Sequence, residues 1–80
     1  MFWEFSTRFN IGDTIYTADY YEGWYARKQP CIVTDIIITA NSKTARLLYK
    51  VKQEDVIDSI PDKLAFATYE KCTKWCDKHN

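Results

Sequence analysis

Hydrophobic and polar residues alternate along the middle of the chain, and this alternation predicts β-strands. The clearest example covers residues 44–52. One face of this predicted strand holds Ala45, Leu47, Tyr49 and Val51. The opposite face holds Arg46, Lys50 and Lys52, with Leu48 as an apolar exception. We therefore expect the first face to point into a core and the basic face to point toward solvent.

Residues 31–39 form the strongest β-strand candidate because β-branched side chains fill most of the segment. Strict alternation puts four of these residues on one face: Ile32, Thr34, Ile36 and Ile38. Shorter strands are expected at residues 14–17, 56–60 and 64–67. Turn residues at 10–13 and 41–43 separate the strands.

The end of the chain changes from an alternating to a helical pattern. Thr68 is a suitable N-cap, and Glu70 occupies the first turn, where a negative charge is favourable. Apolar and aromatic residues then recur at spacings of three and four: Tyr69, Cys72, Trp75, Cys76 and His79. The sequence thus predicts an amphipathic helix over residues 68–79. The first residues alternate only loosely, with Phe2, Phe5 and Phe9 as apolar anchors.

About five short strands followed by one helix predict a mainly β fold, a small antiparallel barrel with a C-terminal α-helix. The 80 residues suffice for one domain, which we expect to span residues 1–80. The expected core is Ile32, Ile36, Leu47, Tyr49, Phe66, Cys72 and Trp75.

Residues 9–16 (FNIGDTIY) resemble the F-x-x-G-D-x-V-Y opening strand of SH3-like small barrels, and residues 64–71 (LAFATYEK) resemble the F-A-T-x-E-E entry into their closing helix. Both motifs occur in short proteins of Firmicutes-type phages and prophages, which the chain therefore resembles. This resemblance implies an SH3-like barrel and an origin in a mobile element. It implies no catalytic residues.

Composition and charge narrow the class further. Aromatic residues make up 16% of the chain, and eleven basic residues balance eleven acidic ones. The aromatic content argues against disorder, and the zero net charge argues against a typical basic nucleic-acid binder. No apolar run reaches the length of a membrane helix, and the first residues lack the pattern of a signal peptide. With three cysteines, an odd number, and no secretion signal, we expect free thiols in a reducing cytoplasm. The resemblance to phage proteins implies that this is the cytoplasm of a bacterial host cell.

A long aromatic loop over residues 18–29 is the main candidate binding site. We assign partner binding to five of its side chains: Tyr20, Tyr21, Trp24, Tyr25 and Arg27. Tyrosine, tryptophan and arginine are enriched at interface hot spots. Gly23 is expected to allow a sharp turn that presents the Trp24 indole outward. The alternatives are that some rings fold back to cap the barrel, or that they stack on a nucleobase.

Other chemistry has weaker support. The basic stripe of Arg46, Lys50 and Lys52 could contact nucleic acid, and nucleic-acid binding is the alternative function. The simpler interpretation of the stripe is an ordinary solvated face of the strand. Cys31, Cys72, Cys76 and His79 together would suit zinc, but we expect the thiols to pack in the core and expect no metal or other cofactor. The single histidine and scattered carboxylates give no catalytic constellation.

The sequence thus leads to a non-enzymatic protein-binding module as the first hypothesis. One concrete version, implied by the resemblance, is a phage accessory protein that inhibits a host or defence protein, of the anti-CRISPR kind. A protein partner is the expected ligand, and self-association is left open.

Overall fold

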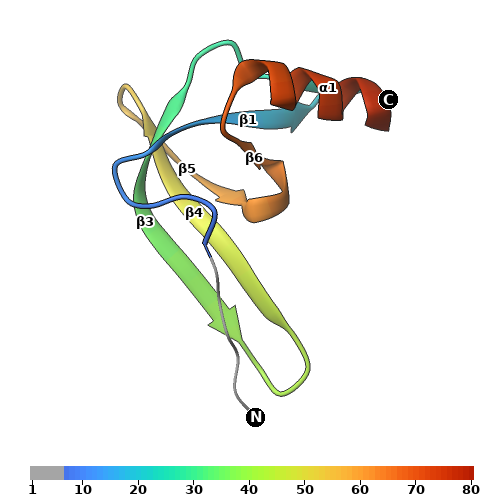
Figure 1. Ribbon diagram of the computed structural model, residues 1–80. Helices are drawn as coiled ribbons and strands as arrows, with labels where there is room; N and C mark the ends of the chain where they lie inside the picture. Colours follow the sequence, from blue (N-terminus) through green and yellow to red (C-terminus); the bar gives the residue numbers. More distant parts are fainter. Residues whose placement is uncertain (1–6) are drawn as a thin grey trace.

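The computed structural model of the protein describes residues 7–80, in which an antiparallel sheet is followed by one helix (Figure 1). The elements are β1 (Thr14–Tyr20), β2 (Trp24–Ala26), β3 (Cys31–Ala40), β4 (Ala45–Gln53), β5 (Val56–Pro61), the short 3-10 helix η1 (Asp62–Leu64), β6 (Ala65–Phe66) and α1 (Tyr69–His79). The predicted anchors Phe2 and Phe5 lie outside the described residues, whereas Phe9 is buried.

The strands bend into a small barrel. Their order is β2-β1-β3-β4-β5, and β6 returns after η1 to pair with β1. All pairings are antiparallel. Strands β3, β4 and β5 form a meander, and η1 then leads the chain into β6, which closes the barrel against β1. The predicted fold class, a mainly β, small antiparallel barrel with one C-terminal helix, is confirmed. The strand in addition to the five expected is β2.

Strand β4 follows its predicted alternation. Tyr49 and Val51 are fully buried, and Leu47 packs against the same core cluster. Tyr49 also contacts Phe9 edge-on, with ring centroids 5.6 Å apart. Its hydroxyl donates to Asp62 Oδ1 at 2.7 Å, so this large side chain is buried with its polar end satisfied. Tyr49 therefore forms the centre of the barrel core.

Strand β3 departs from strict alternation, and the prediction that Ile32 is buried is wrong. Cys31 and Val33 point inward, whereas Ile32 is 53% exposed. The pairing register with β4 shifts between Val33 and Asp35, as in a β-bulge. Beyond this shift Ile36 lies opposite the buried Tyr49 and packs against the core. One inserted residue therefore exchanges the two faces halfway along the strand.

The 3-10 helix η1 is fixed by an arginine from the start of the described chain. Arg8 Nε lies 3.2 Å from Asp62 Oδ1, and Arg8 Nη2 donates to the Ala65 carbonyl at 2.7 Å. This arginine also donates to the Asp62 carbonyl. These bonds hold the turn that leads from β5 into β6.

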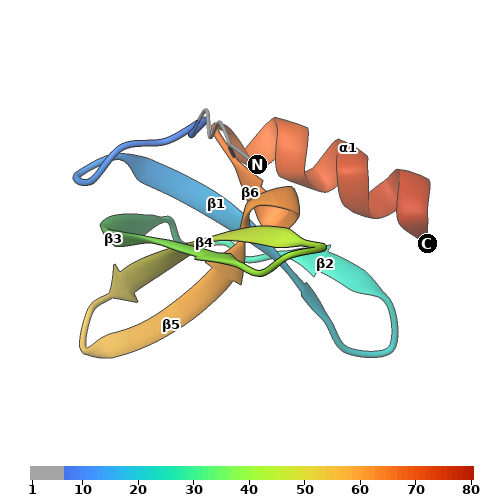
Figure 2. The same ribbon diagram turned by 90° about the horizontal axis from the view of Figure 1, so that it is seen from below.

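Helix α1 begins as predicted and covers one end of the barrel. The Thr68 hydroxyl accepts a hydrogen bond from the Lys71 N–H at 3.1 Å, which satisfies a free donor of the first turn. Cys72 and Cys76 are buried in a second hydrophobic cluster with Ala18. The helix packs against β1, β2 and β6, as Figure 2 shows from below.

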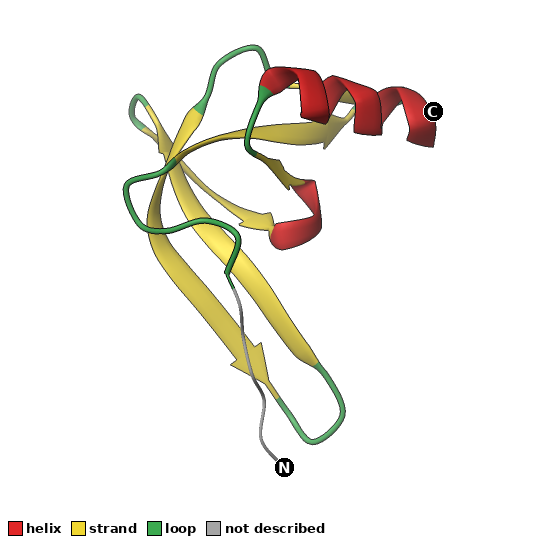
Figure 3. Ribbon diagram, in the orientation of Figure 1, coloured by secondary structure: helices red, strands yellow, loops and turns green. Residues whose placement is uncertain are grey.

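The predicted core is thus largely confirmed. Tyr49 and Cys72 are fully buried, and four predicted residues are half-buried against the two clusters: Ile36, Leu47, Phe66 and Trp75. At the opposite end from α1, the β3–β4 hairpin projects beyond the other strands (Figure 3). No helix within residues 7–80 is long and apolar enough to cross a membrane.

Candidate functional site

The segment predicted as a long loop forms a tight hairpin instead. Strand β1 continues to Tyr20, and β2 pairs with it in the register Ala18 to Ala26 and Tyr20 to Trp24. The turn between them has positive φ angles at Glu22 (55°) and Gly23 (132°). The prediction of a loop over residues 18–29 is therefore wrong for residues 18–20 and 24–26, which are paired strands, whereas residues 27–29 lie outside the strands as expected. The cross-strand contact between Tyr20 and Trp24 stabilises this pairing although the sequence shows no alternation there. We call residues 20–25 the β1–β2 tip.

Three tyrosines of the β1–β2 tip are exposed to solvent. The exposed fractions are 67% for Tyr20, 76% for Tyr21 and 48% for Tyr25. These three rings therefore do not fold back to cap the barrel, which is the alternative to a binding role. Large amphipathic rings held on a short hairpin are suited to contact with another macromolecule.

Trp24 is oriented differently from the prediction. Its indole packs against the cluster of Ala18, Cys72 and Cys76 rather than pointing away from the protein. The Trp24 ring lies edge-on to Trp75, with centroids 5.0 Å apart, and edge-on to Tyr20 at 5.3 Å. The expected outward indole is therefore wrong, because α1 lies against this side of the hairpin and offers apolar surface to bury it.

The last residue of the sequence fastens the hairpin to the helix. The Trp24 N–H donates to Asn80 Oδ1 at 2.6 Å, and Asn80 Nδ2 donates to the Trp24 carbonyl at 2.8 Å. We call this pair of bonds the asparagine clamp. A Cβ atom at Gly23 would lie 3.3 Å from Asn80 Oδ1, so glycine serves both the positive φ and the close approach. Sequence reasoning missed Asn80 because the two partners lie 56 residues apart.

His79 completes the aromatic surface at the helix end. Its ring stacks on Trp75, with centroids 4.0 Å apart and planes 19° from parallel. The His79 Nδ1–H donates to the Trp75 carbonyl at 2.8 Å. The tip and the helix end together line a shallow hollow of about 460 Å³ bounded by Tyr20, Tyr21, Glu22, Gly23, Trp24, His79 and Asn80.

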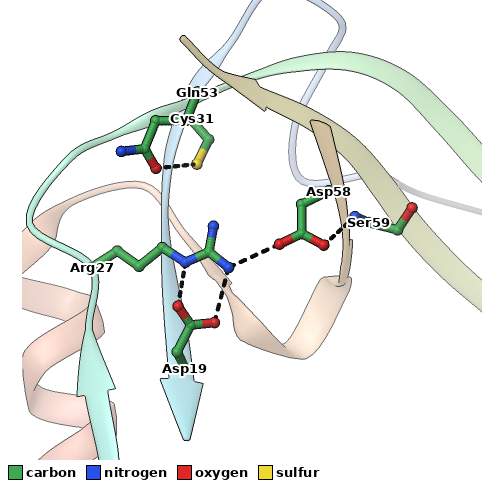
Figure 4. A network of polar contacts seen from close by, with 6 residues as sticks. All are labelled: Asp19, Arg27, Cys31, Gln53, Asp58 and Ser59. Carbon is green, nitrogen blue, oxygen red and sulfur yellow. Dashed lines mark hydrogen bonds and ion pairs between the residues drawn. The ribbon is translucent and has the colours of Figure 1, made fainter. Parts of the chain in front are cut away.

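Arg27 connects the base of the hairpin to β5, as Figure 4 shows. Its Nη2 atom donates to Asp19 Oδ1 at 3.0 Å and to Asp58 Oδ2 at 2.9 Å, and its Nε pairs with the Asp19 carboxylate as well. Hydrogen bonds to Asp19 raise the pKa of Arg27, and the bond from Arg27 lowers the pKa of Asp58. The guanidinium is thus engaged with two carboxylates of its own chain and ties the base of the hairpin to β5, so it is not free for the predicted contact with a partner.

The basic stripe lies elsewhere in the fold. Arg46, Lys50 and Lys52 share the outer face of β4, as predicted, and Lys50 lies opposite Asp35 of β3. Arg46 belongs to the projecting part of the β3–β4 hairpin, which extends away from β1 and α1 (Figure 1). The structure therefore does not merge the stripe with the β1–β2 tip into one surface.

The three cysteines are free and buried, which confirms their predicted packing in the core. Burial raises the pKa of the Cys72 thiol to about 12 and also raises the pKa of Cys31 and Cys76. Cys31 Sγ contacts Gln53 Oε1 at 3.7 Å (Figure 4), and Cys31 belongs to the barrel cluster rather than to the cluster that holds Cys72 and Cys76. Within residues 7–80, no group of three or more cysteine, histidine or acidic side chains has a metal-binding arrangement.

Comparisons of the chain with protein-family models, with curated proteins and with solved structures find no match. The functional argument therefore depends on the geometry of the chain itself.

Proposed function

We propose that the chain is a non-enzymatic protein-binding module that docks through the β1–β2 tip. The observation that carries this proposal is the exposure of Tyr20, Tyr21 and Tyr25 together on one short hairpin. Isolated exposed apolar residues are ordinary, but three exposed tyrosines on one short hairpin give it the amphipathic aromatic character of protein interfaces. Tyr20 and Tyr21 border the hollow at the helix end, whereas Tyr25, which pairs with Asp19, points to the other face of the hairpin.

The rigidity of the tip supports the same proposal. The asparagine clamp and the Trp24–Trp75 contact tie the hairpin to α1, and the bond from Arg27 to Asp58 ties its base to β5. A tyrosine side chain loses little conformational entropy on binding, and a fixed backbone adds little further cost. A tip of this kind would act by steric block, by covering the working surface of its partner.

A narrower version of the proposal names the biological setting. Residues 9–16 and 64–71 resemble segments of small phage and prophage proteins, and this resemblance favours a host or defence protein in the bacterial cytoplasm as the partner. Inhibition of the anti-CRISPR kind would then be the outcome of docking.

The proposal is tested by capture from bacterial lysate and then by measured affinity. Immobilised wild-type protein is compared with a Tyr21→Ala, Tyr25→Ala double variant. The matched control is Tyr69→Ala, which removes a tyrosine that is 42% exposed on α1. We expect the tip variant to lose its captured protein, with a fall in affinity of about 30-fold or more, while the control retains it.

Two results would contradict this function. A partner captured equally by all three proteins would exclude the tip as the docking surface. Binding that falls steeply with salt and is lost on Lys50→Ala would assign the activity to nucleic acid and to the stripe of Arg46, Lys50 and Lys52.

A further inference from the structure

Strand β4 has an open edge where β5 stops. The pairing between these strands runs from Gln53 opposite Val56 to Leu48 opposite Pro61. Proline has no N–H to donate, so the ladder ends there and the chain turns into η1. Within the described residues, Ala45, Arg46 and Leu47 pair only with β3. Figure 1 shows β4 continuing past the end of β5.

A groove follows this open edge. It has a volume of about 540 Å³ and is lined by Arg46, Leu47, Leu48, Pro61, Asp62 and Lys63. Neighbouring residues of a strand point to opposite faces, so Leu47 and Leu48 border the groove from both sides of the sheet. We call it the edge groove. Its location is the position that a continued β5 strand would occupy.

The charges around the edge groove are predominantly positive. The Asp62 carboxylate is already bound by Arg8 at 3.2 Å and by the Tyr49 hydroxyl at 2.7 Å. Arg46 and Lys63 make no ion pair within residues 7–80, and both are exposed. The groove therefore combines apolar walls, unpaired strand backbone and two available cations.

We propose that the edge groove binds an extended acidic peptide segment of a partner protein, which adds to β4 as a strand. Successive residues of a strand direct their N–H and C=O groups to opposite edges, and the Thr44 carbonyl accepts from Asn41 on the β3 side, so Ala45 and Leu47 face the open edge. Backbone groups of the segment would pair with those of Ala45 and Leu47 in the place that β5 leaves. An apolar side chain of the segment would contact Leu47, Leu48 or Pro61, and acidic side chains on either side would meet Arg46 and Lys63. This site is independent of the β1–β2 tip.

The probe is a fluorescein-labelled pentapeptide, acetyl-Glu-Val-Phe-Val-Glu-amide, with binding to the full chain measured by fluorescence anisotropy. Arg46→Glu and Lys63→Glu are each expected to weaken binding by about 3- to 10-fold at low salt. Lys52→Glu makes the same charge change on β4 at a position where β5 is present, and it is expected to leave the affinity unchanged. Backbone amide NMR signals of Ala45, Arg46, Leu47 and Lys63 should shift on binding.

A control peptide with the same side chains but an N-methylated backbone lacks the N–H donors that strand addition requires, and it is expected not to bind. It therefore distinguishes strand addition from contact through apolar side chains alone. Equal affinity of the methylated peptide would overturn the proposal. Shifts confined to Tyr20, Tyr21 and Tyr25 would also overturn it, because the peptide would then be bound at the tip. If the amide signals of residues 45–47 shift with protein concentration in the absence of peptide, the occupant of the edge groove is a second copy of this chain, and the proposal is overturned.

Discussion

Replacing Trp24 with alanine tests whether the indole is structural. The side chain is half-buried against Ala18, Cys72 and Cys76 and makes edge-on contacts with two aromatic rings, Tyr20 and Trp75. Truncating a fully buried tryptophan costs about 3–5 kcal/mol. Because Trp24 keeps part of its surface in water, we expect Trp24→Ala to lower the free energy of unfolding by about 2–3 kcal/mol. For a domain of this size, that loss lowers Tm by about 10–20 °C.

Thermal melts followed by far-UV circular dichroism measure this change. Near-UV circular dichroism adds a local probe, because the Trp24–Trp75 contact contributes to the aromatic signal. Tyr21→Ala is the matched control, since it removes a ring that is 76% exposed from the same hairpin. We expect the control to change stability by no more than about 0.5 kcal/mol.

A Trp24→Ala protein that melts within about 2 °C of the wild type would refute the structural role, because that shift corresponds to less than about 0.5 kcal/mol. It would restore the interpretation drawn from the sequence, in which the Trp24 indole points outward and binds a partner. Trp24→Phe should recover part of the stability, since a phenyl ring keeps some of the contact with Trp75.

Three further predictions concern the turn, the ion pair and the thiols. Gly23→Ala should lower Tm more than Gly12→Ala in thermal melts. Both glycines have positive φ, but only a Cβ atom at Gly23 would meet the asparagine clamp, so equal losses of Tm would exclude that contact. Arg27 lowers the pKa of Asp58, so their pair stabilises the fold above pH about 4 and the contribution is lost as pH falls through the lowered pKa. Urea melts between pH 7 and pH 2 should therefore show a difference between wild type and Asp58→Asn that disappears in acid, and a difference that persists at about pH 2 would contradict the linkage. The Cys72 thiol, with a pKa of about 12, should react with Ellman's reagent at pH 8 only after unfolding, and rapid labelling of the native protein would disprove its burial.

Local patterns predicted the elements that depend on short-range chemistry. The alternation of β4 placed Leu47, Tyr49 and Val51 on the core side, because a strand with one buried face must repeat every second residue. The cap at Thr68 located the start of α1 for a similarly local reason. These features need only neighbouring residues to be recognised.

The remaining features depend on partners far away in the chain. The bulge of β3 between Val33 and Asp35 is set by its pairing with β4, so alternation alone misplaced Ile32. The orientation of Trp24 is decided by α1, which follows it by more than forty residues. The aromatic segment was found from composition, but its division into exposed tyrosines and a packed indole required the tertiary contact.

Because the hydrophobic residues form two clusters, we expect two parts of the protein to differ in stability. One cluster lies inside the barrel around Tyr49, and the other joins Ala18 to α1, with Leu64 packed against both. Such an arrangement favours partial opening, in which α1 and β2 separate while the barrel persists. Amide hydrogens of α1 should then exchange with solvent at a lower free energy than those of β4. A ligand that binds the β1–β2 tip only while it is packed against α1 would slow amide exchange along the whole helix. Binding at the exposed tyrosines would then be detectable as slower exchange at residues of α1 that do not touch the ligand.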